Sequence, residues 1–149
     1  MESEIDYLYE TDFMLSDEQT YSKWLINCAK KLGAKSVSIA FSFMDDEALH
    51  ALNVKYLNHD SYTDIITFDD SVGKDVVANV AISIERVEHN AKTYSQSTQD
   101  ELLRVMCHGL LHCLGLNDKT KDSQQEMRAA EDFCMKLFHV EHKTTNYVS

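Results

Sequence analysis

The chain has 149 residues, a formal net charge of −11 and four cysteines without a C-x-x-C pair, which is typical of one cytoplasmic domain over residues 1–149 with reduced, buried thiols. No apolar run approaches the length of a membrane span, and the first residues lack the basic start of a signal peptide, so we expect no membrane association. The acidic balance excludes a protein that binds nucleic acid through a basic surface over the whole chain, because phosphate contacts need a local excess of Lys and Arg.

The N-terminal part of the chain predicts one helix followed by one strand. Ser16 and Gln19 can form a capping box at the start of the helix. Apolar residues then recur at helical spacing from Tyr21 until Gly33 stops the run. In residues 36–43, apolar side chains alternate with small or polar ones, which is the pattern of a strand that buries one face.

The middle of the chain predicts two strands flanked by helices. β-Branched and aromatic residues dominate both strands, and a glycine turn of hairpin size separates them. The expected elements are, in chain order, a helix that is capped by Asp45 or Asp46 and runs to about Leu57, a strand over residues 62–68, a strand over residues 76–82 and a helix over residues 84–94.

The C-terminal part predicts two further helices. Thr98 and Glu101 can cap a helix over residues 99–114 that is apolar on most sides, so we expect it to be buried in the centre of the fold. Ser123 and Glu126 can cap the last helix. Its expected core residues are Met127, Ala130, Phe133, Cys134, Leu137 and Phe138. The whole pattern predicts an α+β fold in which a small mixed sheet is covered by helices.

The segment from Cys107 to Asp118 carries the pattern of three metal ligands. His108 and His112 are four residues apart, so on a helix their imidazoles lie one above the other and can bind the same ion. A third ligand at Asp118 requires the helix to end and the chain to fold back, and Gly115 can adopt the left-handed conformation of such a reversal. The complete pattern predicts one ion bound by His108, His112 and Asp118.

A structural alternative is that two histidines on a packed helix bind backbone groups, with Asp118 as an ordinary loop residue. It is disfavoured because the apolar surroundings would make two buried imidazoles costly. Cys107 and Cys113 flank the histidines but point away from the ion on a helix, so we interpret them as packing residues. His139 and His142 lie near a polar C-terminus, and we expect them to be exposed rather than part of a second site.

The ligand set also indicates a type of chemistry. Two nitrogen ligands and one oxygen ligand leave a fourth tetrahedral position for water, which is typical of catalytic rather than structural zinc. Zinc lowers the pKa of its bound water to about 7, so hydrolysis is the expected reaction. Zinc metalloproteases place a glutamate directly after the first histidine, where this chain has Gly109. Phosphodiester cleavage is therefore favoured over peptide hydrolysis, because the metal itself can stabilise the charge that develops on the phosphate.

Two separated motifs occur in this order along the chain. They are Leu52-Asn53, Tyr56, Asp60 and T-D-I-I-T-F at residues 63–68, followed by H-G-L-L-H-C-L-G at residues 108–115. Glu101 and Glu131 extend the same pattern. Through these residues, the chain from about residue 36 to 138 resembles the YbeY family of single-strand-specific, metal-dependent endoribonucleases.

The resemblance implies a mixed sheet of about four strands, with helices around it and a buried metal-binding helix. It also implies one Zn²⁺ ion, cytoplasmic location, and cleavage of single-stranded RNA by metal-activated water in ribosomal RNA maturation and ribosome quality control. Ribosomal RNA and the ribosome are the implied partners. Thr63 and Asp64 match the family motif and are candidate catalytic residues, although a structural role in the loop and strand fits them equally well. Lys119 is a further candidate on the basis of its charge.

Two departures from the family pattern affect the expected mechanism. The family's third histidine falls at Asp118, whose carboxylate is an acceptable zinc ligand but adds negative charge beside the metal. The family's arginine, thought to steady the substrate phosphate, falls at Leu57. Lys119 or Arg86 could substitute for this arginine. Further candidates for a local basic patch are Lys74, Lys92, Arg104 and Lys121, for each of which a solvated surface charge is the simpler interpretation.

Two other functions fit the same residues. One is a ribosome-associated assembly or binding factor that keeps the metal site but has weak or no nuclease activity, which the missing arginine and the acidic charge both favour. The weaker one is a hydrolase that acts on a small molecule. Competition by RNA for the activity would separate that hydrolase from a nuclease.

Overall fold

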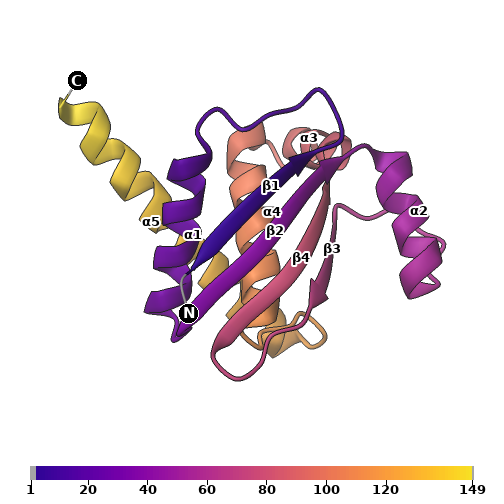
Figure 1. Cartoon of the computed structure of the whole chain (residues 1–149). Helices are drawn as coiled ribbons and strands as arrows, with labels where there is room; N and C mark the ends of the chain where they lie inside the picture. Colours follow the sequence, from indigo (N-terminus) through magenta and orange to yellow (C-terminus); the bar gives the residue numbers. More distant parts are fainter. Residues whose placement is uncertain (1–2, 149) are drawn as a thin grey trace.

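The structure, a computed structural model, describes residues 3–148, with side chains described as far as residue 140. Four strands and five helices follow one another along the described chain (Figure 1). They are β1 (Glu4–Tyr9), α1 (Glu18–Lys31), β2 (Ser36–Met44), α2 (Asp46–Leu57), β3 (Ile65–Asp69), β4 (Asp75–Ser83), α3 (Ile84–Thr93), α4 (Thr98–Cys113) and α5 (Lys121–Val148).

The strands form one mixed sheet in the order β1-β2-β4-β3 (Figure 1). β1, β2 and β4 run parallel to one another, and β3 pairs antiparallel with β4. Parallel neighbours need a crossover connection, which α1 supplies between β1 and β2, whereas the antiparallel pair β3 and β4 needs only a short turn. The predicted α+β class, with a mixed sheet of about four strands, is confirmed.

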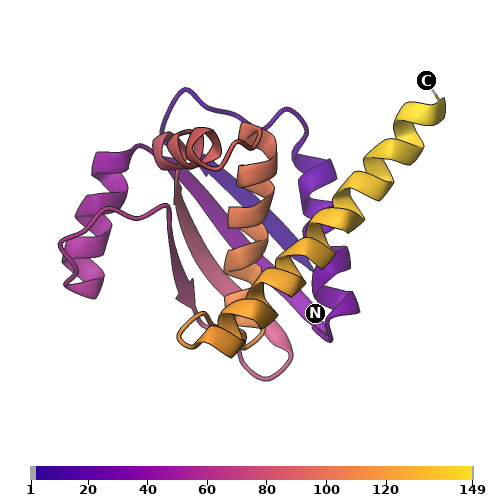
Figure 2. The same ribbon diagram turned by 180° about the vertical axis from the view of Figure 1, so that it is seen from behind.

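The helices cover mainly one face of this sheet. α1 and α4 lie against it, and α5 crosses the outer side of both (Figure 2). On the covered face, the side chains of β2 are at most 1% exposed: Val37, Ile39, Phe41 and Phe43. On the opposite face the intervening residues Ser38, Ala40 and Ser42 are half-buried, and α2 covers one end of that face. The expectation of a sheet covered by helices therefore holds for one face.

β1 is an element that the sequence-based expectations lack. Its residues alternate between exposed and half-buried along the whole strand. Glu4 and Asp6 point outward, while Tyr7 stacks on Phe41 and Phe43 of the neighbouring strand. β1 forms one edge of the sheet, where outward charges oppose pairing with another chain. The alternating pattern was thus a signal for this strand.

Several predicted helix ends are displaced by one residue. The side chain that caps α1 belongs to Asp17 rather than Ser16, because the Asp17 carboxylate accepts from the N–H of Thr20. Likewise the hydroxyl of Ser97, not of Thr98, caps α4, because it accepts from the N–H of Asp100. In each case two adjacent residues can cap a helix, and sequence alone does not choose between them.

Two other boundaries and one core residue differ from expectation. β3 begins at Ile65, three residues later than predicted, so the residues before it form a loop. α5 begins at Lys121, ahead of the predicted capping box, and Thr120 accepts the N–H of Ser123 there. Phe133 is 40% exposed, because α5 packs with one side only and Phe133 lies beyond that side. His139 is exposed as expected, and the side chain of His142 lies outside the described residues.

The remaining general expectations concern cysteines and membranes. Cys28, Cys107 and Cys134 are buried, Cys113 is half-buried, and all four are free thiols, as expected. In the described part of the chain, no helix combines the length and the hydrophobicity that a bilayer crossing requires.

The central helix α4 approaches the sheet most closely at Gly109. A Cβ atom built at this position would lie 3.2 Å from the Ile65 side chain and 3.3 Å from that of Val80. Contacts this short would force the neighbouring side chains to move by a few tenths of an ångström even for a methyl group, and a larger side chain would demand more. Gly109 therefore allows the helix that carries both histidines to rest directly on β3 and β4.

We expect Gly109→Leu to lower the free energy of unfolding by about 2 kcal/mol or more, because the added side chain must push α4 off the sheet. Urea denaturation of the purified protein measures this loss. Ala51→Leu, at an exposed position of α2, is the matched control and should change stability by less than about 0.5 kcal/mol. Equal stability of the two variants would contradict the close packing at Gly109.

Candidate metal centre

The two histidines of α4 face each other at the surface of the buried helix. Their four-residue spacing places the ring centroids of His108 and His112 4.6 Å apart. The two Nε2 atoms lie 3.0 Å from each other, and both residues are half-buried. Two ring nitrogens directed at one point are arranged as ligands of a common ion would be.

The chain reverses direction directly after α4. Gly115 has a φ of +99°, in the left-handed region that favours glycine. The N–H of Gly115 donates to the carbonyl of His112 over 3.0 Å, and the N–H of Leu116 donates to that of Leu111 over 3.1 Å. After this reversal, Oδ2 of Asp118 lies 3.8 Å from Nε2 of His108. The structure therefore contains the fold-back that the spacing required.

The donor set fits a metal ion. Among the described residues, His108, His112 and Asp118 are the group whose ligand atoms all lie within 4.8 Å of one another. Two nitrogens bound to one tetrahedral zinc are separated by about 3.3 Å, given the usual Zn–N bond length. The observed separation of 3.0 Å is close to this value. Two imidazoles and one carboxylate can thus hold a cation here.

Glu131, on α5, binds His108 through the ring nitrogen that does not face His112. Nδ1–H of His108 donates to one carboxylate oxygen of Glu131 over 2.7 Å, and Arg104 donates to the other, also over 2.7 Å. Glu131 is only 5% exposed. This hydrogen bond sets the tautomer in which Nε2 of His108 carries a free lone pair, as a metal ligand needs.

Sequence reasoning placed Glu131 in the family pattern without giving it a role. A usable signal was present, because Glu131 is a charged residue within the predicted core stripe, four residues after Met127 and three before Cys134. A carboxylate at such a position needs a buried partner. Which residue is that partner depends on how α5 crosses α4, and this crossing is a tertiary feature.

The pKa values of these groups follow from burial and hydrogen bonding. Burial opposes the charged form of His108, but the hydrogen bond and the charge of Glu131 outweigh it and raise the pKa of His108. Burial alone would raise the pKa of Glu131, yet the hydrogen bonds from His108 and Arg104 lower it overall. Burial and the nearby charge of His108 lower the pKa of His112. His112 therefore offers a neutral imidazole to a metal at neutral pH.

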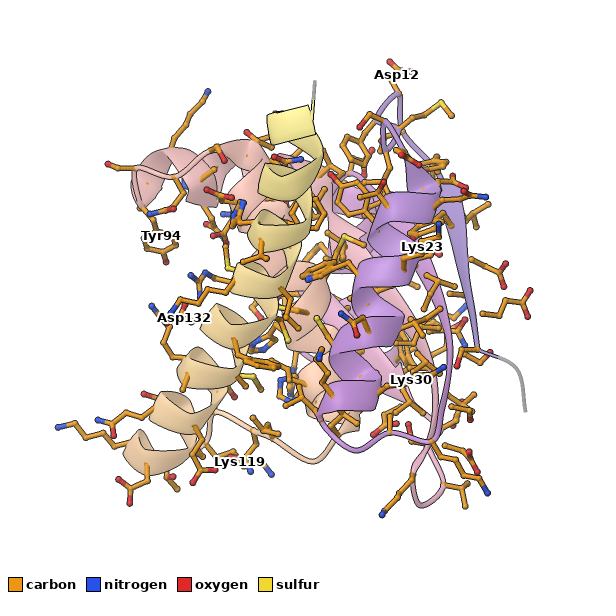
Figure 3. The ribbon with its side chains drawn as sticks, turned by 90° about the vertical axis from the view of Figure 1, so that its left-hand side faces the viewer. Asp12, Lys23, Lys30, Tyr94, Lys119 and Asp132 are labelled. Carbon is orange, nitrogen blue, oxygen red and sulfur yellow. The ribbon has the colours of Figure 1, made fainter. Side chains whose placement is uncertain are left out.

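A cavity of about 490 Å³ opens beside the three side chains. Thr63 and Asp64 line it from the loop before β3, and Leu57 lines it from the end of α2. Thus the structure brings two of the three candidate catalytic residues to the ligands, together with the position where the family arginine falls. Lys119 follows Asp118 in the loop before α5 (Figure 3) but is absent from the described lining of this cavity.

The two arginines among the candidate cations are already bound to carboxylates. Arg86 donates to Asp46 over 2.7 Å, and Arg104 donates to Glu131 and, over 3.5 Å, to Asp132. Arg86 therefore serves to hold α3 against the start of α2 and does not stand free to replace the family arginine. The lysines among the candidates are exposed: Lys74, Lys92, Lys119 and Lys121.

Similar proteins are known for nearly the whole chain. Endoribonuclease YbeY of Flavobacterium johnsoniae is 44% identical over 137 residues, which cover 92% of this chain and 99% of that protein. Endoribonuclease YbeY of Christiangramia forsetii is 43% identical over 138 residues, with coverages of 93% and 96%. The solution structure of TM1509 from Thermotoga maritima has a TM-score of 0.69 at 22% identity, covering 95% of this chain and 93% of that one. The last likeness concerns the fold alone.

The two endoribonuclease relatives and a family model define the protein as an enzyme of the hydrolytic nuclease class. A family model described as endoribonuclease YbeY matches residues 8–139. The chain belongs to the endoribonuclease YbeY family, and the match includes the end of β1 and all of α1, which lie before the residues that carried the resemblance in the sequence.

The hydrogen bond between His108 and Glu131 predicts a pH-dependent contribution to stability in the metal-free protein. The raised pKa of His108 stabilises the fold below the ordinary value of 6.5, and this contribution is lost as the pH rises through the folded-state pKa. The lowered pKa of Glu131 stabilises the fold above the ordinary value of 4.5, and this contribution is lost as the pH falls through the folded-state pKa. Both contributions to the free energy of unfolding are therefore fully present between pH 4.5 and pH 6.5.

We therefore expect Glu131→Gln to lower the free energy of unfolding of the chelator-treated protein by about 2 kcal/mol near pH 5.5, and by less near pH 8. Urea denaturation at both pH values measures the difference. Glu126→Gln, at an exposed position of α5, should have little effect at either pH. A loss of stability in Glu131→Gln that is the same at both pH values would contradict the pairing of charged His108 with Glu131.

Proposed function

We propose that the protein is a zinc-dependent endoribonuclease that cleaves single-stranded RNA in ribosomal RNA maturation and ribosome quality control in the cytoplasm. The convergence of two imidazoles and one carboxylate on one point, inside a cavity of about 490 Å³, carries this proposal. Membership of the endoribonuclease YbeY family supports an RNA substrate. The names of the relatives do not specify ribosomal RNA, so this part rests on the resemblance of the sequence motifs.

In this proposal His108, His112 and Asp118 hold one Zn²⁺ ion. When bound, the ion supplies hydroxide at neutral pH and polarises the phosphate whose P–O bond is hydrolysed. Glu131 keeps His108 oriented with its lone pair toward the ion. The stacked packing of α4 on the sheet fixes both imidazoles before a metal is bound, so binding requires little reordering of the chain.

Thr63 and Asp64 are the chain's candidates for contact with substrate or with metal-bound water. Both line the cavity beside the ligands and precede β3. The hydroxyl of Thr63 donates to the carbonyl of Ile65 over 3.3 Å, which gives Thr63 a part in holding the loop as well. Asp64 is half-buried, and its charge contributes to raising the pKa of His108. A carboxylate that lines the same cavity as the ligands is a candidate to accept a proton from water.

An assembly factor with weak nuclease activity is the second candidate function. It is favoured by Leu57, an apolar residue that lines the cavity where the family pattern has an arginine. Without that cation, the cavity wall at Leu57 offers no charge to a phosphate. Such a protein would keep the metal and bind RNA, but its cleavage rate would be low.

Metal content tests the ligand set. We expect Asp118→Ala to lose zinc during dialysis and Asp118→His to keep it, because imidazole nitrogen binds zinc at least as well as a carboxylate does. Elemental analysis of the purified proteins measures the ratio of zinc to protein. Asp122→Ala, at an exposed position at the start of α5, is the control and should retain zinc. Equal zinc in wild type and Asp118→Ala would remove Asp118 from the site.

Cleavage of a labelled single-stranded RNA tests the activity. We expect His112→Ala to lower kcat/KM by more than about 100-fold, beyond the loss usual for groups that only surround a metal ligand. His89→Ala, at an exposed position of α3, should cleave like the wild type. Identical cleavage by wild type and His112→Ala would indicate a contaminating nuclease. Metal-bound wild type that binds RNA without cutting it would favour the assembly factor.

A further inference from the structure

The surroundings of the candidate metal centre are unfavourable for RNA. Four carboxylates besides the ligand Asp118 line the cavities that adjoin it: Asp64, Asp69, Glu101 and Glu131. Each backbone phosphate of RNA carries a negative charge, and affinity for it comes from Lys and Arg. An RNA strand is repelled by these carboxylates and therefore needs a cation beside them in order to bind.

Arg128 is the available cation at this site. Among the described residues that line the cavities around the ligands, the positively charged ones are Arg104 and Arg128. The guanidinium of Arg104 is bound to Glu131 and Asp132. By contrast, Arg128 forms no hydrogen bond or ion pair with any side chain in the described part of the chain, and it is exposed. A free guanidinium can bind a phosphate through two parallel N–H donors.

The position of Arg128 links it to the ligands. Arg128 lies three residues before Glu131 on α5, so both side chains are on neighbouring positions of the same helix face. It lines a cavity of about 270 Å³ together with His108 and Asp118. It also lines a cavity of about 360 Å³ that Asp64 and Glu101 share. Arg128 thus reaches both hollows on the α5 side of the ligands.

The hollow continues along the outer side of α5. A depression of about 460 Å³ begins at Arg128 and Gln124, which also line the cavity beside the ligands. Its other lining residues are Lys121, Gln125, Ala129 and Asp132. Lys121 lies seven residues before Arg128, which is two helical turns or about 10 Å along the same face. The amide groups of Gln124 and Gln125 add neutral hydrogen-bond donors between the two cations.

We propose that the RNA strand leaves the metal centre across the first two turns of α5, with Arg128 binding a backbone phosphate beside the ligands and Lys121 binding a phosphate farther along. This inference rests on the proposed function and adds to it the path of the substrate. The path supplies positive charge in the cavities beside the ligands that Arg128 lines and Leu57 does not. Asp132 lies one helical turn after Arg128 in the same depression, and its pairing with Arg104 over 3.5 Å offsets part of its repulsion of the RNA strand.

The test compares zinc-loaded variants by the salt dependence of RNA affinity, measured by fluorescence anisotropy of a labelled single-stranded RNA before cleavage is detectable. We expect Arg128→Ala to weaken binding about five- to tenfold, as the loss of one hydrogen-bonded contact does. The slope of log affinity against log salt should fall by about 0.7. Arg128→Lys should keep the slope, because it keeps the charge. In the double variant Arg128→Ala/Lys121→Ala, the slope should be smaller than that of the wild type by about 1.4, because two phosphate contacts are lost and each contributes about 0.7.

Lys30→Ala is the matched control, because it removes one positive charge from an exposed position of α1 (Figure 3). Its affinity and slope should equal those of the wild type. Zinc content and thermal stability of Arg128→Ala should also be unchanged, which separates phosphate binding from a structural effect on Glu131. A slope in Arg128→Ala equal to that of the wild type would overturn the path.

RNA cleavage by the wild type is measured in the same samples, so the two proposals fail separately. Wild type that cleaves RNA, with Arg128→Ala binding and cleaving as well as the wild type does, would leave the nuclease function in place and refute the path. Wild type that binds RNA with the expected dependence on Arg128, without cleaving it, would support the path and refute the nuclease function.

Discussion

The site depends on a constraint that α4 must satisfy on two sides at once. One side of the helix is packed into the core, and Gly109 brings its backbone onto β3 and β4. The other side presents His108 and His112 to a cavity, and Glu131 of α5 holds the first imidazole by a hydrogen bond of 2.7 Å. The sheet, α4 and α5 therefore form one stack. A shift of α4 away from α5 would lengthen the hydrogen bond between His108 and Glu131, and a shift away from the sheet would open the close contact at Gly109.

Sequence patterns were sufficient for the features that are local along the chain. The helical and alternating patterns predicted α1, β2, β4 and α4 nearly to the residue, and the spacing from His112 through Gly115 to Asp118 predicted the reversal after α4. These features are determined by interactions within a few residues, namely capping, side-chain periodicity and the left-handed glycine. They include the whole set of proposed ligands, because all three belong to one segment of the chain.

Features that depend on contacts between distant segments were not accessible in this way. The partner of Glu131 is set by the crossing of α5 over α4, and the neighbours of Leu57 are set by the loop that brings α2 to the cavity. Arg86 and Arg104 look alike as isolated surface cations in the sequence, yet each is bound to a carboxylate that is at least 27 residues away. Charge alone therefore could not tell a free arginine from a paired one, and Arg128 had no sequence pattern to mark it.

The charge of the site explains why a free arginine matters more in this chain than the family pattern would suggest. Where the pattern has a histidine and an arginine, this chain has Asp118 and Leu57, so the site gains one negative charge at Asp118 and lacks one positive charge at Leu57. Each of the two changes weakens the attraction for a phosphate, because an added carboxylate and a lost cation both lower the electrostatic potential at the site. A guanidinium at Arg128 restores one positive charge, in cavities beside the ligands that Leu57 does not line. The direction from which a polyanion can approach is thereby displaced from α2 toward α5.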